Sequence, residues 1–168
     1  MSESVSGGLI DERVEVISNE RVAPSIYLME LLAPGIASRV SPGQFIHLEI
    51  PNFGGHVLRR PFSVYMWDND RKAIRLLYQT VGSGSGRLTQ ARWGEFARAI
   101  GPVGRGWNPP ASTHRAVLVC GGMGVAPLTM LAEQLVFSGA HVDCLLGATT
   151  AERLVGEQML REIGRAHV

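Results

Sequence analysis

The stretch AVLVCGGMGVAPLTML, residues 116–131, decides how the second part of the chain is built. Its first five residues are apolar, as in a buried strand, and the glycines after them permit a tight turn. The residues from Ala126 onward indicate a helix, and Pro127 is compatible with it because proline is tolerated in a first helical turn. The sequence therefore predicts a strand, a glycine turn and a helix in succession.

The residues that follow repeat this alternation. We expect strands over Ala116–Cys120 and Val142–Leu146, and helices over Ala126–Ser138 and Ala151–Ile163. Alternating strands and helices form the unit of an open parallel sheet covered by helices. Two strands are few for such a sheet, because parallel sheets are buried on both faces, so further strands of this domain are expected to be missing.

The first hundred residues have a different pattern, in which short apolar segments alternate with turn residues. Strands are expected at Arg13–Val16, Ile26–Leu32, Gln44–Ile50, Phe62–Trp67 and Ile74–Thr80, with one short helix at Arg87–Arg92. This spacing is typical of an antiparallel barrel, with a sandwich as the alternative. The glycine- and proline-rich segment Gly101–Ser112 separates the two patterns, which predicts domains at residues 1–108 and 109–168.

Composition excludes several classes of function. The formal net charge of +1 gives no broad basic surface, so nucleic acid is not expected as a partner. No charged start leads into an apolar stretch, and no segment has the roughly 18 apolar residues of a membrane span, so a cytoplasmic protein without membrane contact is expected. Cys120 and Cys144 are the only cysteines and are expected to be buried free thiols, so no metal site is predicted.

Two segments of the first domain carry residues suited to binding an anion. In RRPFSV, residues 59–64, Arg60 can bind a phosphate through parallel hydrogen bonds, while Phe62 lies on the same side of a strand and Ser63 adds a hydroxyl. In VGSGSGRL, residues 81–88, backbone N–H groups can converge on an anion near a helix start. The alternatives are a solvated arginine before a core strand and a flexible turn.

A third segment, CGGMGVAP at residues 120–127, lies where a dinucleotide pyrophosphate meets a helix amino terminus. It departs from the GxGxxG pattern because Pro127 stands where the third glycine would be. The order RPFS, VGSGSGRL, GPVGRGW, VCGGMGVAPL and LLGATT resembles the ferredoxin–NADP reductase superfamily, and within it the electron-transfer subunits of dihydroorotate dehydrogenase. The resemblance implies an antiparallel six-stranded flavin-binding barrel followed by a truncated parallel α/β nucleotide-binding domain.

The resemblance also implies roles for residues at the matching positions. Arg60, with Pro61, would bind the FAD pyrophosphate, Phe62 would stack on the isoalloxazine, and Ser63 would be catalytic near its N5 atom. The remaining expected cofactor residues are Gly82, Ser83, Gly84 and Ser85 for the flavin phosphates and Gly121, Gly122 and Gly124 for NAD(H). The segment Gly101–Trp107 would be an interdomain turn near the flavin.

The expected function is that of an FAD-containing electron-transfer subunit between the dihydroorotate dehydrogenase catalytic subunit of pyrimidine biosynthesis and NAD(H). The sequence GATT at residues 147–150 lacks the arginine of many NADP-using relatives, which argues against NADP. The four-cysteine [2Fe–2S] site of the family is not expected in this chain. The alternatives are a reductase module for another iron–sulfur partner, of hydrogenase or oxygenase type, and a non-catalytic flavin-binding fragment. Exposed sheet edges would favour a homodimer or a partner chain.

Overall fold

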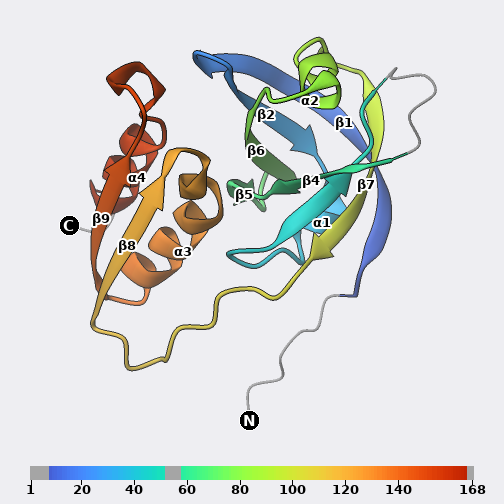
Figure 1. Ribbon diagram of the computed structural model, residues 1–168. Coiled ribbons are helices and arrows are strands. Elements are labelled where there is room, and N and C mark those ends of the chain that lie inside the picture. Colours follow the sequence, from blue (N-terminus) through green and yellow to red (C-terminus); the bar gives the residue numbers. More distant parts are fainter. Residues whose placement is uncertain (1–7, 52–57, 166–168) are drawn as a thin grey trace.

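The computed structural model describes residues 8–51 and 58–165, which form two sheets. Seven strands make one antiparallel sheet, and two strands make a second, parallel sheet. Figure 1 shows the two sheets side by side, joined by a long irregular segment between β7 (Phe96–Val103) and β8 (Arg115–Gly121). A domain boundary at residue 108, inside this segment, stays a prediction.

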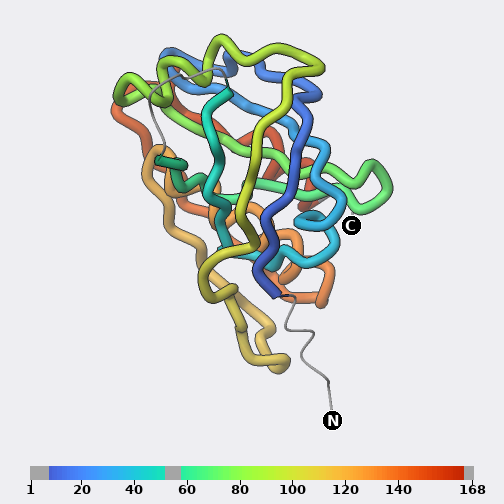
Figure 2. Tube along the Cα trace, turned by 90° about the vertical axis from the view of Figure 1, so that its right-hand side faces the viewer, coloured from blue at the N-terminus to red at the C-terminus, as the bar shows by residue number. Residues whose placement is uncertain are grey.

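The larger sheet has the order β4-β3-β7-β1-β2-β6-β5. Its other strands are β1 (Ile10–Ala23), β2 (Ile26–Leu32), β3 (Phe45–Leu48), β4 (Arg60–Ser63), β5 (Met66–Asp68) and β6 (Ala73–Gln79). Figure 2 shows β3, β7 and β1 lying next to one another across one side of this curled sheet. The antiparallel fold expected for the first part of the chain is confirmed.

One chain segment closes the sheet on itself. Strands β4 and β5 lie at opposite ends of the strand order but are successive parts of residues 60–68. Between them, the N–H of Val64 donates to the carbonyl oxygen of Gln44 at 3.1 Å, and the N–H of Tyr65 donates to that of Arg75 at 2.8 Å. The segment therefore pairs with β3 on one side and with β6 on the other, so that six chain segments surround the barrel core.

The sequence interpretation missed strand β7, and it placed Gly101–Val103 in a turn although these residues end that strand. Ala97 and Ala99 face the core, while Phe96 and Arg98 are exposed. The alternation gives only a weak strand signal, because the inward residues are small and have no strong strand preference. The segment is a strand because it pairs with β1 and β3.

The short helix of the barrel also differs from its predicted position. It is α2 (Ser83–Leu88), so it begins within the glycine-serine run rather than at Arg87. The Ser85 hydroxyl oxygen accepts hydrogen bonds from the N–H groups of Val81 and Gly82 at 2.9 and 3.2 Å, and this fixes the first turn. Leu88 is fully buried in the barrel core and holds the other end. A further short helix, α1 (Pro34–Ala37), was not predicted.

The second part of the chain follows the predicted alternation. Strand β8 is followed by a 3₁₀ turn (Gly122–Val125), α3 (Ala126–Phe137), β9 (His141–Gly147), a second 3₁₀ turn (Ala151–Arg153) and α4 (Glu157–Arg165). Helix α4 begins later than predicted. Gly156, the residue before its first turn, has a positive φ of 85°, which does not continue a right-handed helix. The strands pair in parallel from Arg115↔His141 to Gly121↔Gly147.

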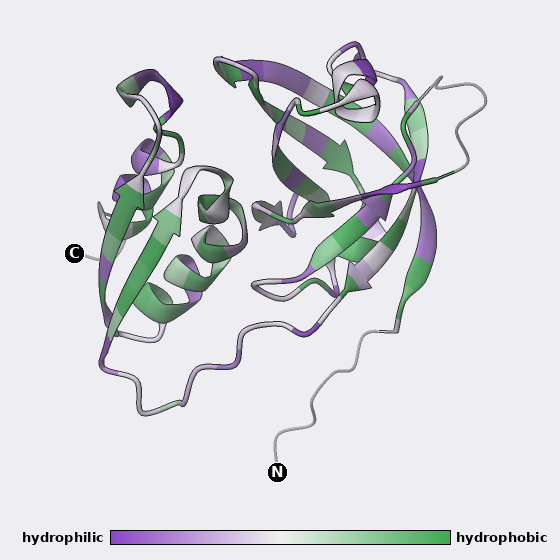
Figure 3. Cartoon of the chain, viewed as in Figure 1, coloured by the Kyte–Doolittle hydropathy of each residue, from purple (hydrophilic) through white to green (hydrophobic). Residues whose placement is uncertain are grey.

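The parallel sheet has one covered and one exposed face. Leu118 packs with Leu131 and Leu135 of α3. On the other face, Val117 and Val119 are 56% and 69% exposed, and Figure 3 shows the strands as apolar. A core cluster is continuous between the barrel and the first residues of α3. No helix in the described ranges is long and apolar enough to cross a membrane.

Candidate functional site

A pocket of about 550 Å³ lies where the barrel meets the start of α3. We call it the barrel pocket. Its lining comprises Arg60, Pro61, Phe62, Ser63, Leu77, Tyr78, Gln79, Val81, Gly82, Ser83, Gly84, Ser85, Met123 and Ala126. Its size is within the range of ligand-binding pockets. The structure thus brings together the two anion-binding segments that the sequence singled out in the first domain.

Arg60 lies against the first turn of α2. Its Nη1 donates to the carbonyl oxygen of Leu58 at 3.1 Å, and a Cβ at Gly84 would lie 3.2 Å from its Nε. Among the described residues, no carboxylate forms an ion pair with Arg60. The first N–H groups of a helix have no acceptor within the helix. A guanidinium without a counter-ion and these N–H groups therefore face the same space, which suits a phosphate.

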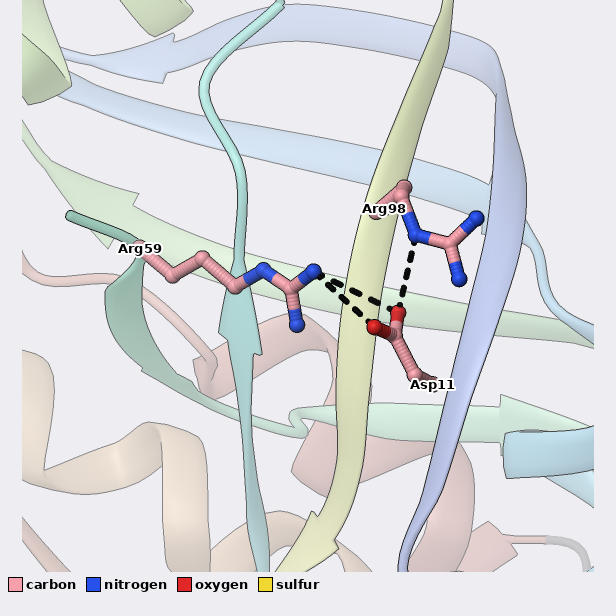
Figure 4. Close-up of polar contacts among 3 residues, drawn as sticks. All are labelled: Asp11, Arg59 and Arg98. Atoms are coloured by element: carbon pink, nitrogen blue, oxygen red, sulfur yellow. Dashed lines mark hydrogen bonds and ion pairs between the residues drawn. The ribbon is translucent and has the colours of Figure 1, made fainter. Parts of the chain in front are cut away.

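The neighbouring Arg59 has different surroundings. Figure 4 shows Arg59 and Arg98 pointing toward the carboxylate of Asp11 from separate elements. Each guanidinium lies 3.1 Å from an oxygen of that carboxylate. Desolvation opposes ionisation of Asp11, but the two arginines outweigh it and hold the pKa of this carboxyl below its usual range. Arg59 is therefore occupied by a protein counter-ion, whereas Arg60 is not.

Aromatic rings form a wall of the barrel pocket. Phe62 lies edge-on to Tyr78, with ring centroids 5.7 Å apart. Tyr78 in turn stacks on Tyr27 at 5.6 Å. Burial raises the pKa of Tyr78 above its usual range, so its hydroxyl is neutral and donates to Asn19 Oδ1 at 3.0 Å. The wall therefore has a fixed orientation and suits a flat aromatic ligand.

Asn19 connects this wall to the end of α2. Its Nδ2 donates to the carbonyl oxygens of Leu88 and Ala91 at 2.8 and 3.2 Å. One side chain thus fixes both the ring of Tyr78 and the helix whose first turn faces Arg60. The sequence interpretation missed Tyr78 and Asn19, because an alternating strand residue and a strand asparagine give no local signal for this role.

A second pocket, which we call the strand-end pocket, has a volume of about 480 Å³ and lies at the carboxyl ends of β8 and β9. Its lining comprises Ile26, Gln79, Gly121, Gly122, Met123, Gly147, Ala148, Thr149 and Arg153. It shares Gln79 and Met123 with the barrel pocket. Ligands in open α/β sheets bind at this edge.

Of the three glycines predicted to bind NAD(H), two line the strand-end pocket and one does not. Gly121 and Gly122 line the strand-end pocket, and Gly122 has a φ of 51° that favours glycine. Gly124 is not part of either lining, and a Cβ there would lie 3.7 Å from the Cβ of Cys120. Arg153, which the sequence interpretation did not select, is the single cation among the described lining residues.

No group of three or more potential metal ligands occurs in the described ranges. Both cysteines are free, but only Cys120 is buried as expected, whereas Cys144 is half-buried. Desolvation raises the pKa of each thiol above its usual range. An iron–sulfur cluster takes four protein ligands, normally thiolates. We therefore predict that iron and acid-labile sulfide analysis of the purified chain finds neither in stoichiometric amount. Two irons and two sulfides per chain would contradict this.

Comparison with known proteins gives consistent results. No family model matches the chain. Among curated relatives, the dihydroorotate dehydrogenase B (NAD(+)) electron transfer subunit of Desulforamulus reducens is 36% identical over 80% of this chain and 51% of its own length. The subunit of the same name from Geobacillus sp. is 34% identical over 94% of this chain and 62% of its own length. The chain thus spans between half and two thirds of these relatives.

Solved structures show the same fold. An NADH-dependent reduced ferredoxin-NADP oxidoreductase matches 89% of this chain and 53% of its own, with a TM-score of 0.79 and 24% identity. The ferredoxin reductase of carbazole 1,9a-dioxygenase matches 91% of this chain and 47% of its own, with a TM-score of 0.79 and 19% identity. The flavohemoglobin of Malassezia yamatoensis, solved with bound FAD and heme, matches 93% and 43%, with a TM-score of 0.78 and 16% identity.

Proposed function

Because the chain is homologous to electron transfer subunits of dihydroorotate dehydrogenase B and has a ferredoxin reductase-like fold, we propose that it is a flavin-binding electron-transfer module. In this proposal it binds FAD and passes electrons between a partner dehydrogenase and NAD(H). The names of the relatives support the dihydroorotate dehydrogenase catalytic subunit of pyrimidine biosynthesis as that partner. The free cysteines suit the cytoplasmic location that we propose.

The residues of the barrel pocket fit FAD on three grounds. Arg60 has no carboxylate partner among the described residues and supplies a charge-assisted contact to a phosphate. Gly84 leaves room for that arginine, where a Cβ would lie 3.2 Å from Nε. Phe62 and Tyr78 present an aromatic wall on the same pocket. We therefore assign the phosphates to Arg60 and the turn Gly82–Ser85.

The residues of the barrel pocket would bind and orient the cofactor. FAD, when bound, supplies the electron and hydride transfer. Arg60 and the turn Gly82–Ser85 would hold the phosphates, while Pro61 fixes the strand between Arg60 and Phe62. Phe62 would exclude water from one side of the ring, and Ser63 would supply a hydroxyl near its reacting edge. Ser63 is our proposal for the catalytic residue.

The strand-end pocket is our proposal for the pyridine nucleotide site. Gly121 and Gly122 allow close approach of a pyrophosphate, and Gly124 belongs to the same turn. Arg153 supplies a positive charge for a nucleotide phosphate. Because this pocket shares Gln79 and Met123 with the barrel pocket, ligands in the two pockets would be neighbours.

The observation that carries the proposal is the convergence of Arg60, Phe62 and the turn Gly82–Ser85 on one pocket. We expect the purified chain, incubated with FAD and passed through a desalting column, to retain yellow flavin in an amount equal to protein. Riboflavin, which has no phosphate for Arg60, should be lost from the chain on the same column. Loss of FAD, or equal retention of riboflavin, would contradict this assignment.

A further inference from the structure

The segment after β7 packs against the turn Ser41–Gln44, which lies between α1 and β3. The Nε2 of Gln44 donates to the carbonyl oxygen of Gly104 at 2.9 Å, and the N–H of Trp107 donates to that of Pro42 at 2.8 Å. A Cβ at Gly106 would lie 3.1 Å from the Cβ of Ser41 and 3.2 Å from the Pro42 oxygen. The glycines of GPVGRGW thus allow two pieces of backbone to lie in close contact.

Trp107 covers the middle of that turn with its indole ring. A Cβ at Gly43 would lie 2.4 Å from Cδ1 and 2.5 Å from Nε1 of Trp107, and Gly43 has a φ of 87°. Any other residue at position 43 would therefore displace the indole and strain the backbone. The ring is fixed on the barrel although it is 50% exposed.

The same indole contacts the second part of the chain. Its Nε1 donates to the carbonyl oxygen of Pro127 at 3.3 Å. Pro127 is the second residue of α3, and this helix follows directly the glycine turn of the strand-end pocket. Met123 and Ala126, which flank the helix start, also line the barrel pocket. Trp107 therefore connects the barrel to the backbone that borders both pockets.

A second barrel side chain contacts the same helical turn. The Tyr65 hydroxyl forms a hydrogen bond with Thr129, and burial raises the pKa of Tyr65 to about 12, so the hydroxyl stays neutral. Thr129 is completely buried, and its hydroxyl donates to the Val125 carbonyl oxygen at 3.0 Å. The start of α3 thus contacts the barrel at a buried position through Tyr65 and at an exposed position through Trp107.

We propose that Trp107 is a positioning residue that holds the start of α3, and with it the pyridine nucleotide site, against the flavin barrel. The proposal rests on the proposed function for its effect on electron transfer, but the contact itself does not depend on it. Hydride transfer requires the two reacting rings at near van der Waals distance, so a small displacement lowers the rate strongly. Trp107 lines neither pocket, so it would affect this distance only through the position of α3.

Limited trypsin digestion of the full chain tests the contact without any ligand. Arg105 is exposed and lies inside the segment after β7. We expect Trp107→Ala to speed cleavage after Arg105 by about tenfold, measured by mass spectrometry, because the segment opens more often. Gly43→Ala, which displaces the indole while keeping Trp107, should do the same. Trp93→Ala is the matched control, since Trp93 is exposed in a separate turn and should leave this rate unchanged.

Single-turnover reduction of the FAD-loaded chain by NADH tests the effect on positioning. Trp107→Ala should lower the rate at saturating NADH by about tenfold with unchanged FAD affinity. Trp107→Phe keeps a ring but lacks the N–H donor, so its reduction rate should lie between those of the parent and Trp107→Ala. Unchanged cleavage after Arg105, an unchanged reduction rate, or a loss of FAD affinity equal to the loss of rate would each overturn the proposal. If the parent chain binds no FAD, the proposed function fails while the cleavage comparison still decides the contact.

Discussion

Replacing Arg60 with alanine is expected to weaken FAD binding by about 10- to 100-fold, because a charge-assisted hydrogen bond to a phosphate contributes roughly 1.5–3 kcal/mol. The effect should be this large because Arg60 forms no ion pair with a carboxylate in the described ranges and has no alternative anionic partner there. Titration of the apo-chain with FAD, followed by quenching of flavin fluorescence, measures the change. Arg60→Lys should fall between the parent and Arg60→Ala, since lysine keeps the charge but not the fork.

Arg59→Ala is the matched control for this experiment. It removes the same charge one residue away, but Arg59 binds Asp11, which also binds Arg98. The affinity for FAD should stay within about twofold of the parent, because Arg59 lies outside the barrel-pocket lining and its charge is paired with Asp11. If Arg59→Ala and Arg60→Ala weaken FAD equally, the effect is one of net charge and the assignment of Arg60 to the phosphates is wrong.

Replacing Asn19 with alanine is expected to lower the free energy of unfolding by about 2–4 kcal/mol, because it leaves buried partners without hydrogen bonds. The Tyr78 hydroxyl would lose its acceptor, and the carbonyl oxygens of Leu88 and Ala91 would lose their donor. For a chain of this size the melting temperature should fall by about 5–15 °C, measured by calorimetry without ligand.

Tyr78→Phe separates the parts of this network. It removes one hydrogen bond but keeps Asn19 bound to the end of α2, so the loss should be about 1 kcal/mol. A further expectation follows for the ligand, because Asn19 holds the helix that faces Arg60. Asn19→Ala should weaken FAD more than Tyr78→Phe does. Equal stability of Asn19→Ala and the parent would show that water replaces the side chain and that the network has no structural role.

Local signals in the sequence predicted the fold class and the alternation of strands and helices from β8 to α4. The alternation of strands and helices over residues 116–163 predicted the parallel sheet. The segments around Arg60 and Gly84 each carry a local signal for anion binding. These two segments line one pocket because closure of the barrel brings β4 beside α2. No local sequence pattern predicts this long-range contact. Their roles as ligand-binding residues stay predictions.

The parts that the sequence did not predict depend on contacts between distant residues. Strand β7 is defined by its pairing with β1 and β3, since its inward residues Ala97 and Ala99 have weak strand preference. Asn19 is separated from Leu88 by 69 positions, so its role exists only in the folded chain. The sequence predicts Trp107 only as the end of an interdomain turn, and the structure shows that its ring reaches the Pro127 carbonyl oxygen.

The segment 60–68 has two tasks, because it closes the barrel and also carries Arg60, Phe62 and Ser63. Its backbone pairs with β3 on one side and β6 on the other, so these side chains cannot move apart unless the ring of strands opens. Much of the conformational entropy of ordering this part of the pocket is therefore lost during folding and not during association. A ligand that enters the barrel pocket meets side chains that are already in place. Its binding free energy is therefore reduced less than it would be if binding had to order these side chains.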